Sequence, residues 1–537
     1  MWMAIPALLP IFTALVLMCK FKVKPAAAML AALLTAVILA KWLWQMDITM
    51  LLAAAIRGTF ISLDIIFIIL GAILLLNVMR TSGAINSINQ TFSGISNDRR
   101  IQIIIIAWLF GGFVEGASGF GAAPALAAPL LAGLGFPPLI AAGVSLICNT
   151  LPVPFGAVGI PAKTSVSCLE AELTANGMNI ENFRMAMLND LTMFSGISGV
   201  FLPLLAIAFM IVLAGGKRKM RSIVEIAPLA LFSAAAYIIP WRLTALWFGP
   251  ELPSMTGALV GLPLTIIMVK RGFLVPAHVW DFPGENDRIL PQPENSCRMI
   301  PAYQAWMPYL LLAAVLMVIR FPGSPIPGFL AKFRIILPDM FAIPDSGSSW
   351  AILLNPGLTP IAIIAVASAL IWKIPSCGIS KIAKDTWHQT APSAIAIAAS
   401  TAVVQIMVAS ETNNADIPGM LNCVAIAAAN GMGRFFAVIS PFIGIFGTFF
   451  AGSCTVSNIL FSPLQFKTAL YLGLDPALCV ALQNIGGGLG SMIRISGVIA
   501  ACATVNISGK EGRLIMLNSI PAAIMALLAV IAALIAG

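Results

Sequence analysis

Charged residues are scarce in this chain of 537 residues, because they make up only 9% of it. A soluble protein needs roughly a quarter of its residues charged to remain wetted. The chain is also 60% hydrophobic, with a mean hydropathy of +0.98, so most of its surface cannot face water. The composition therefore excludes an ordinary soluble protein and indicates that lipid is the natural solvent of this chain.

Residues that bind metals or perform covalent catalysis are also scarce. There are two histidines, His278 and His388, and nine cysteines that form no C-x-x-C pair. The motifs G-x-S-x-G, H-E-x-x-H and C-x-x-C-H do not occur, and neither does the Gly-Lys-Ser/Thr loop that holds nucleotide phosphates. The sequence therefore predicts a protein that is no enzyme and no ATP-driven pump, with no metal, no disulfide framework and no cofactor other than a proton as co-substrate.

Positive charge, which gives a net charge of +9, gathers at the ends of apolar runs. Clusters lie at 20–24, 98–100 and 217–221, as expected for cytoplasmic loops under the positive-inside rule. Because no soluble domain presents them, we expect no nucleic-acid partner. The first apolar run, 1–18, precedes its basic residues, so we interpret it as a retained transmembrane helix rather than a cleaved signal.

Apolar stretches long enough to cross a membrane recur along the whole chain. Their number predicts about 12 to 15 transmembrane helices in a single polytopic domain, residues 1–537. The longer polar connections, 161–184, 271–302 and 321–349, do not have the composition of a folded soluble domain. The predicted fold class is thus an all-α membrane protein of the inner (plasma) membrane, in contact with the lipid bilayer. The sequence gives no oligomeric state.

Two stretches, 111–135 and 447–463, contain too many glycines, prolines and small polar residues for ordinary membrane helices. Backbone groups freed by such breaks are tolerated only where they are buried in protein or line a water-filled cavity. Both stretches are therefore expected at the centre of the protein.

The two stretches also resemble each other. Residues 116–119 are followed by Leu-Gly-Phe-Pro from 134, and residues 452–455 are followed by Leu-Gly-Leu-Asp-Pro from 472. This pattern predicts two homologous, inverted repeats, with cores of about 98–161 and 437–506, each containing a re-entrant hairpin and a broken helix. Chance similarity between glycine- and alanine-rich segments is the alternative.

Glu115 lies inside an apolar run, immediately before the first break. An ionisable side chain at membrane depth is costly and by default faces the bundle interior or a water-filled pathway. Because burial disfavours the charged carboxylate, such a group can exchange protons near neutral pH. Glu115 is the predicted proton-coupling residue. The alternative is a carboxylate that only caps a broken helix.

Small residues and hydrogen-bonding side chains gather at both breaks, where helix N-termini suit an anionic ligand. The alternative for each polar residue alone is helix packing. Arg494 could bind a carboxylate in bidentate fashion, reach the interface or pair with an acid. For Asp64, ion pairing is the default expectation. The candidates for substrate binding are Gly116, Ser118, Gly119, Gly121, Asn149, Thr150, Gly452, Ser453, Thr455, Ser457, Asn458, Asn484 and Arg494.

Four longer motifs carry a family resemblance. They are FVEGASGFGAAP at 113–124, NTLPVPFGAVGIP at 149–161, GSCTVSNILF at 452–461 and GKEG at 509–512. In these motifs and in their order along the chain, the sequence resembles the lactate permease family. The resemblance implies an integral membrane symporter of lactate and glycolate, coupled to protons, on a two-repeat scaffold with inward-dipping hairpins.

The chain departs from the family pattern in several places. The family usually has Asp where this chain has Cys454 and Lys where it has Ser491, and Arg494 appears three residues further on. Arg494 could replace the lysine as the partner of the anion. Loss of the acid could change the proton stoichiometry or the substrate.

The sequence therefore predicts secondary active transport of lactate, and of similar 2-hydroxy monocarboxylates such as glycolate, by proton symport with alternating access. Without a co-ion, moving one negative charge against the membrane potential costs about 2.3 kcal/mol per 100 mV, which a symported proton avoids. The alternatives are another small organic anion or coupling to Na⁺ on the same scaffold. An intramembrane enzyme using Glu115 or Asp64 and a channel are more remote.

Overall fold

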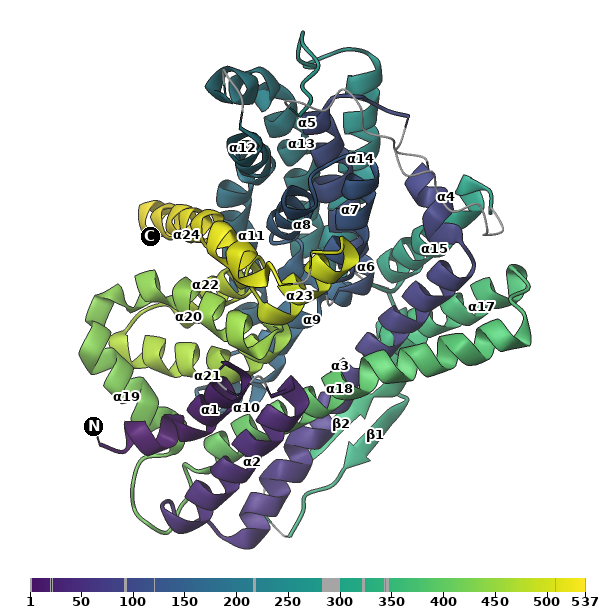
Figure 1. The fold of residues 1–537 in the computed structure, drawn as a ribbon. Coiled ribbons are helices and arrows are strands. Elements are labelled where there is room, and N and C mark those ends of the chain that lie inside the picture. The colour runs from purple at the N-terminus through teal and green to yellow at the C-terminus, as the bar shows by residue number, and fades with distance from the viewer. Residues whose placement is uncertain are drawn as a thin grey trace.

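The computed structural model describes residues 2–19, 21, 23–90, 94–119, 121–215, 219–282, 300–320, 324–341, 343, 347–507 and 509–536. Of the predicted basic clusters, Lys20, Lys22, Lys217 and Arg218 lie outside the described residues. The described chain is nearly all helical, and Figure 1 shows three groups of helices packed around a common centre.

The first group is an arm of long helices in which α3 and α18 pack along each other, at the lower right of Figure 1. Its short hairpin pairs β1 with β2 in antiparallel register, with Ile335 opposite Trp350. The elements of this group are α1 (Ala4–Cys19), α2 (Pro25–Trp42), α3 (Ile48–Thr81), α4 (Ala84–Gln90), α15 (Ala302–Arg320), α16 (Ile326–Leu330), β1 (Arg334–Leu337), β2 (Ser348–Ala351), η3 (Ile352–Leu354), η4 (Gly357–Ala362), α17 (Ile363–Ile371) and α18 (Ser376–Ala409).

The second group, most of which lies in the upper part of Figure 1, contains the first predicted break. Its elements are α5 (Arg99–Gln102), the π-helix η1 (Ile103–Phe110), α6 (Gly111–Ser118), α7 (Ala122–Gly133), α8 (Pro138–Cys148), η2 (Val153–Phe155), α9 (Gly156–Ser167), α10 (Glu170–Ala175), α11 (Ile180–Gly199), α12 (Leu202–Ala214), α13 (Lys219–Phe248) and α14 (Pro253–Lys270).

The third group contains the second predicted break and the C-terminus. Asp475 caps its helix α22 by accepting a hydrogen bond from the backbone N–H of Ala477 at 2.8 Å, and Pro476 occupies the first turn. The elements are α19 (Met420–Met432), η5 (Gly433–Phe435), α20 (Phe436–Ala451), α21 (Cys454–Leu472), α22 (Pro476–Gly490), α23 (Ile495–Thr504) and α24 (Glu511–Ala536).

Ten helices among the described residues are long and apolar enough to cross a membrane, or eleven if the bent pair formed by 138–148 and 153–175 is one span. The sequence predicts about 12 to 15 spans. The difference arises because several apolar stretches form shorter helices, including Ala4–Ala14, Met420–Met432 and Phe436–Phe449. The predicted fold class, an α-helical membrane protein, is confirmed.

Both glycine-rich stretches reverse the direction of the chain. Helix α6 ends at Ser118, and the left-handed residues Gly119 (φ +63°) and Gly121 (φ +83°) turn the chain so that α7 packs back against η1. In the third group, α20 ends at the left-handed Gly452 (φ +68°), and α21 packs back against α20. A left-handed backbone costs little only for glycine, so these turns need glycine where they occur.

Each reversal is followed by a second interruption. Helices α8 and α9 are bent by 65°, and the first turn of α9 contains three left-handed residues, Ala157, Val158 and Gly159. For Val158 this conformation (φ +58°) is strained, because its side chain is branched at Cβ. In the third group, the residues from Ser491 to Arg494 separate α22 from α23.

The interrupted elements of the two groups pack against each other reciprocally. Helix α21, which follows the turn in the third group, packs against α9. Helix α7, which follows the turn in the second group, packs against α23. The four helix ends created by the breaks therefore lie at one junction between the groups.

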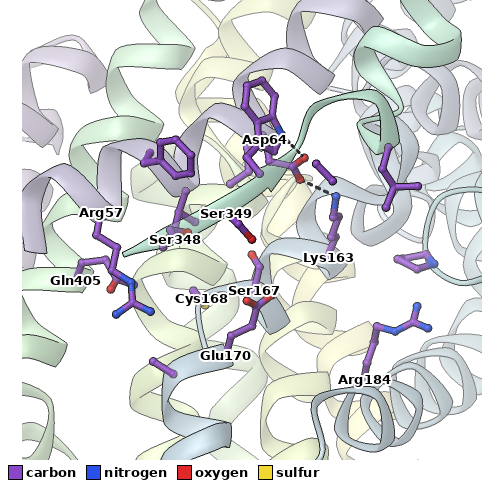
Figure 2. A pocket seen from close by; sticks show the side chains of 18 of the residues that line it. Arg57, Asp64, Lys163, Ser167, Cys168, Glu170, Arg184, Ser348, Ser349 and Gln405 are labelled. Carbon is purple, nitrogen blue, oxygen red and sulfur yellow. Dashed lines mark hydrogen bonds and ion pairs between the residues drawn. The ribbon is translucent and has the colours of Figure 1, made fainter. Parts of the chain in front are cut away.

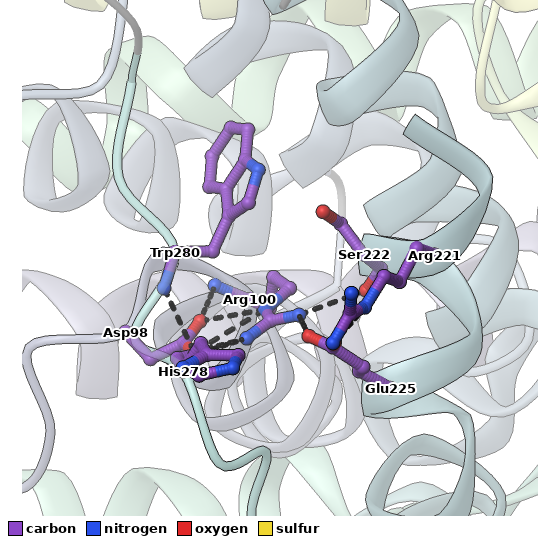
Figure 3. A network of polar contacts seen from close by, with 7 residues as sticks. All are labelled: Asp98, Arg100, Arg221, Ser222, Glu225, His278 and Trp280. Carbon is purple, nitrogen blue, oxygen red and sulfur yellow. Dashed lines mark hydrogen bonds and ion pairs between the residues drawn. The ribbon is translucent and has the colours of Figure 1, made fainter. Parts of the chain in front are cut away.

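A buried ionic network fixes the start of η1 and thereby the approach to this junction (Figure 3). Arg100 is fully buried and pairs with Asp98 at 2.7 Å, while Asp98 also caps α5 by accepting from the Arg100 backbone N–H. The guanidinium donates further to the carbonyls of Ser222 and His278 and lies 3.6 Å from Glu225. This part of the predicted 98–100 cluster is therefore a structural anchor rather than a solvated loop.

Candidate functional site

A small cavity lies at the junction of the broken helices. The space open to the centre of a water molecule is about 20 Å³, enough for one water. Residues of both predicted breaks and of the first turn of α9 contribute to it. Its walls are Glu115, Gly119, Val153, Gly156, Ala157, Ile160, Pro161, Ser453, Cys454, Thr455 and Arg494.

Glu115 forms the acidic wall of the cavity. It lies one turn before the end of α6 and is only 3% exposed. The carboxyl group faces the Asn149 side chain and the backbone N–H groups of Gly121 and Ala123 at the start of α7. Its Oε2 atom has no hydrogen-bond partner within the described part of the chain. The positive end of α7 thus stabilises the carboxylate, while one oxygen is left for another ligand.

Arg494 forms the basic wall. It follows α22, is 7% exposed, and donates from Nη1 to the carbonyl of Gly452 at 3.4 Å. Its Nη2 atom lies against Gly121, where the Cβ of any other residue would collide with it. The Nε atom has no hydrogen-bond partner among the residues described. The guanidinium therefore lies between the turn after α6 and the turn before α21.

Glu115 and Arg494 are thus opposite charges that line one cavity. The ion pairs found among the described residues do not include this pair, although each carries an unpartnered polar atom. Buried charges are normally paired and buried polar atoms normally hydrogen-bonded, so two opposite charges with unpartnered atoms at one cavity make this cavity the candidate site. A guanidinium suits a carboxylate ligand, and a buried carboxyl suits proton exchange.

The third component is the start of α21. Ser453 has an extended backbone (φ −154°) and precedes the helix, while Cys454 and Thr455 are its first two residues. All three line the cavity. The N–H groups of a first helical turn have no partner within the helix, so they and the two hydroxyl groups can hydrogen-bond an anion and its neighbouring hydroxyl.

Three of the predicted site residues belong instead to a buried network beside the cavity. Asn458 donates to the side chain of Asn484 at 2.7 Å and to the carbonyl of Pro161 at 3.1 Å. Asn484 donates to Ser165 at 2.9 Å, and Ser457 accepts from Gln483. Because these bonds join α21, α22 and α9, the network holds the two groups of helices together.

We expect Asn458→Ala to destabilise the protein without a direct effect on substrate recognition. The change leaves the buried Pro161 carbonyl and the Asn484 amide oxygen without their donor, which costs about 1 to 3 kcal/mol for each unsatisfied group. Thermal unfolding in detergent measures the loss. The matched control is Asn414→Ala, because Asn414 is exposed. Equal stability of the two variants would contradict the structural role.

Some of the remaining predicted residues line the cavity or contact its charged groups, and the others only pack near it. Gly116 packs against the backbone of Ser254 and Met255, and the Thr150 hydroxyl donates to the Ile147 carbonyl within its own turn. Ser118 faces the Tyr309 hydroxyl. These three residues shape the surroundings and do not line the cavity, whereas Gly119, Gly121, Asn149 and Gly452 lie in it or against its charged groups.

The first turn of α9 was not among the predicted site residues. Gly156, Ala157, Ile160 and Pro161 form one wall of the cavity, and Gly156 lies against the Glu115 carboxyl. The sequence signal was present, because two glycines and a proline occur within six residues of an apolar run. That signal indicated a broken helix, but it did not show that this break packs against the breaks in 111–135 and 447–463.

A second, larger cavity of about 450 Å³ lies further along α9 (Figure 2). Lys163 on α9 and Asp64 on α3 form an ion pair of 2.6 Å at its wall. Asp64 thus has the ion-pairing role expected for it. Lys163 was not predicted, because it lies in 161–184, which was expected to be a polar connection, where a lysine is ordinary.

Comparison with known proteins finds relatives that match along most of the chain. The chain is 31% identical to the L-lactate permease of Bacillus subtilis, over 95% of this chain and 92% of the relative. It is 30% identical to the L-lactate permease of Escherichia coli K12 and 29% identical to the Glycolate permease GlcA of the same strain, in each case over 95% of this chain and 91% of the relative.

Among solved structures, the YdaH transporter of Alcanivorax borkumensis matches with a TM-score of 0.40 and 13% identity, over 86% of this chain and 84% of that chain. The sequence model of the L-lactate permease family matches residues 3–537. This protein is therefore a multi-pass integral membrane protein of the plasma membrane and belongs to the L-lactate permease family.

Proposed function

We propose that this protein carries lactate and glycolate across the plasma membrane by proton symport with alternating access. The observation that carries the proposal is the cavity in which a buried acid, Glu115, faces a buried base, Arg494, between broken helices. The relatives named L-lactate permease and Glycolate permease support a small 2-hydroxy monocarboxylate as the substrate.

Each wall of the cavity has a role in this proposal. Arg494 binds the carboxylate of the substrate, for which its planar guanidinium offers parallel donors. Ser453, Thr455 and the first-turn N–H groups of α21 bind the carboxylate lone pairs that the guanidinium leaves free and the 2-hydroxyl. Glu115 carries the proton. The proton is the only co-substrate, and no other cofactor takes part.

The proton makes the transport cycle electroneutral. Glu115 without a proton balances Arg494 in the absence of substrate. When the substrate carboxylate arrives, the cavity would hold two negative charges and one positive charge unless Glu115 gains a proton. A net charge in a site of low dielectric is strongly disfavoured, so binding of the anion and of the proton are coupled.

Alternating access is supported by the size of the cavity and by its walls. The cavity holds one water, so a substrate enters only when the surrounding helix ends separate. The reciprocal packing of α7 with α23 and of α21 with α9 supports the two inverted repeats, with cores of about 98–161 and 437–506. The strained first turn of α9, at Ala157 and Val158, is the proposed hinge.

The test is uptake of labelled L-lactate into vesicles that contain only this protein, with an imposed inward proton gradient. Accumulation that a protonophore abolishes is the expected result. Absence of uptake by folded protein would overturn lactate as the substrate. A panel of competing acids, with and without Na⁺, then identifies a different anion or co-ion. An internal substrate concentration that never exceeds the external one would indicate a channel.

Cys454, where the family usually has Asp, lies in the same cavity as Arg494. An aspartate at this position would therefore affect transport measurably. We expect Cys454→Asp to lower lactate transport at neutral pH by about tenfold, because the new carboxylate competes with the substrate for the guanidinium. Transport should recover as the pH falls and the new acid is protonated. The control is Cys454→Ser, which adds no charge. Identical pH profiles for the two variants would contradict this prediction.

A further inference from the structure

The larger cavity of Figure 2 has the size and chemistry of a small-molecule site. Its volume of about 450 Å³ falls within the usual range of roughly 300 to 1,000 Å³. Charged side chains of both signs surround it. The cations are Arg57, Lys163 and Arg184, and the acids are Asp64, Glu170, Glu181 and Glu251.

Helix α9 connects this outer cavity to the inner one. Pro161 lines the inner cavity, and Lys163, two residues further along the same helix, lines the outer cavity. Ser167, one turn later, also lines the outer cavity and lies near Lys163 in Figure 2. Lys163 is therefore the cation of the outer cavity that lies next to the inner site along the chain.

The two oxygens of Asp64 have different partners. Oδ1 accepts from the indole N–H of Trp350 at 3.0 Å and from the side chain of Asn355 at 2.8 Å. Oδ2 accepts from Lys163 at 2.6 Å. If Lys163 moves away, Asp64 keeps both neutral donors on Oδ1, and water in the cavity can solvate Oδ2.

The ion pair is also open to the cavity. The side chains of Lys163 and Asp64 are 33% and 27% exposed, and Figure 2 shows both at its wall. Partly exposed ion pairs contribute little net stability, so the partner of Lys163 can be exchanged at small cost. A buried pair without alternative donors would not permit such an exchange.

We infer that Lys163 is an outer binding residue for the substrate carboxylate and that Asp64 is the resident counter-ion which the substrate displaces. This inference rests on the proposed function, because the ligand is the same 2-hydroxy monocarboxylate. The anion binds Lys163 in the outer cavity, where Ser167, one turn further along α9, offers a hydrogen bond to its hydroxyl group. It then passes along α9 to Arg494 as the inner cavity opens.

The competing explanation is that the ion pair only fastens α3 to α9. The two explanations predict different results for the two halves of the pair. If the pair is only a fastener, Asp64→Asn and Lys163→Met break the same contact and have the same effect. If Lys163 binds substrate, removing Asp64 frees the cation for the anion, whereas removing Lys163 deletes the site.

The experiment is lactate exchange in vesicles at equal internal and external pH. We expect Lys163→Met to raise the half-saturating lactate concentration about tenfold, because a charge-assisted hydrogen bond to the substrate is lost. We expect Asp64→Asn to lower it about threefold, because Asp64 no longer competes with the substrate for Lys163. Lys163→Arg should keep a value near that of the unmodified protein. The charge-swapped pair, Asp64→Lys with Lys163→Asp, should not restore it.

A shift in the same direction for both single variants, or rescue by the swapped pair, would overturn the inference and leave the proposed function intact. If the unmodified protein exchanges no lactate, the proposed function itself fails. Trp350 gives a second measurement, because its indole donates to Asp64. Lactate should change its fluorescence even in Arg494→Gln, with Trp350→Phe as the control. No change in Arg494→Gln would overturn the outer site.

Discussion

Replacing Glu115 by Gln is expected to abolish proton-driven accumulation of lactate while exchange of lactate across the membrane continues. Glutamine has nearly the shape of a protonated glutamate and keeps an acceptor for the N–H groups at the start of α7. It cannot release a proton, however. An electroneutral symporter driven by a gradient of one pH unit accumulates substrate about tenfold, because that gradient is worth about 1.4 kcal/mol. The variant should therefore accumulate none.

The measurement is the ratio of internal to external lactate at steady state, followed by exchange of labelled for unlabelled lactate in the same vesicles. Asp416→Asn is the matched control, because Asp416 is an exposed carboxyl group before α19. If the Glu115 variant accumulates lactate as the unmodified protein does, the proton is carried elsewhere. Loss of exchange as well would mean that Glu115 is needed for binding.

Replacing Arg494 by Gln is expected to abolish both accumulation and exchange, with a loss of at least about 100-fold in transport rate. The guanidinium is the basic group of the inner cavity, and truncating one partner of a buried charged contact costs about 2 to 5 kcal/mol. Arg494→Lys keeps the charge but offers no parallel donors. We expect that variant to bind lactate about tenfold more weakly and still to transport it.

A rescue experiment separates loss of the cation from loss of the fold. Ser491 lies three residues before Arg494, is buried, and has a hydroxyl group with no partner in the described chain. The double variant Ser491→Lys with Arg494→Ser moves the positive charge three residues back along the chain, to the position where the family resemblance places a lysine. It should regain lactate exchange. Thermal unfolding checks that Arg494→Gln is folded, and lactate exchange by that folded variant would contradict the role of Arg494.

These predictions depend on groups that the sequence identified to different degrees. Glu115 was identifiable because a carboxyl group inside an apolar run has few explanations other than a pathway or a cap. The breaks at 119–121 and at Gly452 were identifiable because several glycines within a membrane segment cannot continue a lipid-facing helix. For Arg494, the sequence left binding, snorkelling and pairing equally open, and the structure places the side chain buried against Gly121 and Gly452.

The polar residues near the breaks show where sequence reasoning stops. Ser453 and Asn458 are five residues apart, and both were predicted to bind substrate. Ser453 lines the cavity, whereas Asn458 bonds to Pro161, which is 297 residues away in the sequence. Helical position alone could not separate them, because an amide can bind a ligand or a neighbouring helix with the same hydrogen bonds.

The sequence by itself determined that the chain lies in lipid, that it is helical, where its membrane helices break, and that Glu115 precedes the first break. These follow from local properties, namely hydropathy, glycine content and the cost of an ion in lipid. Only the tertiary structure decided which side chains share a cavity, and it paired Lys163 with Asp64, 99 residues apart. The physical reason is that the role of a polar side chain depends on the groups packed around it, and packing brings together residues that no local pattern connects.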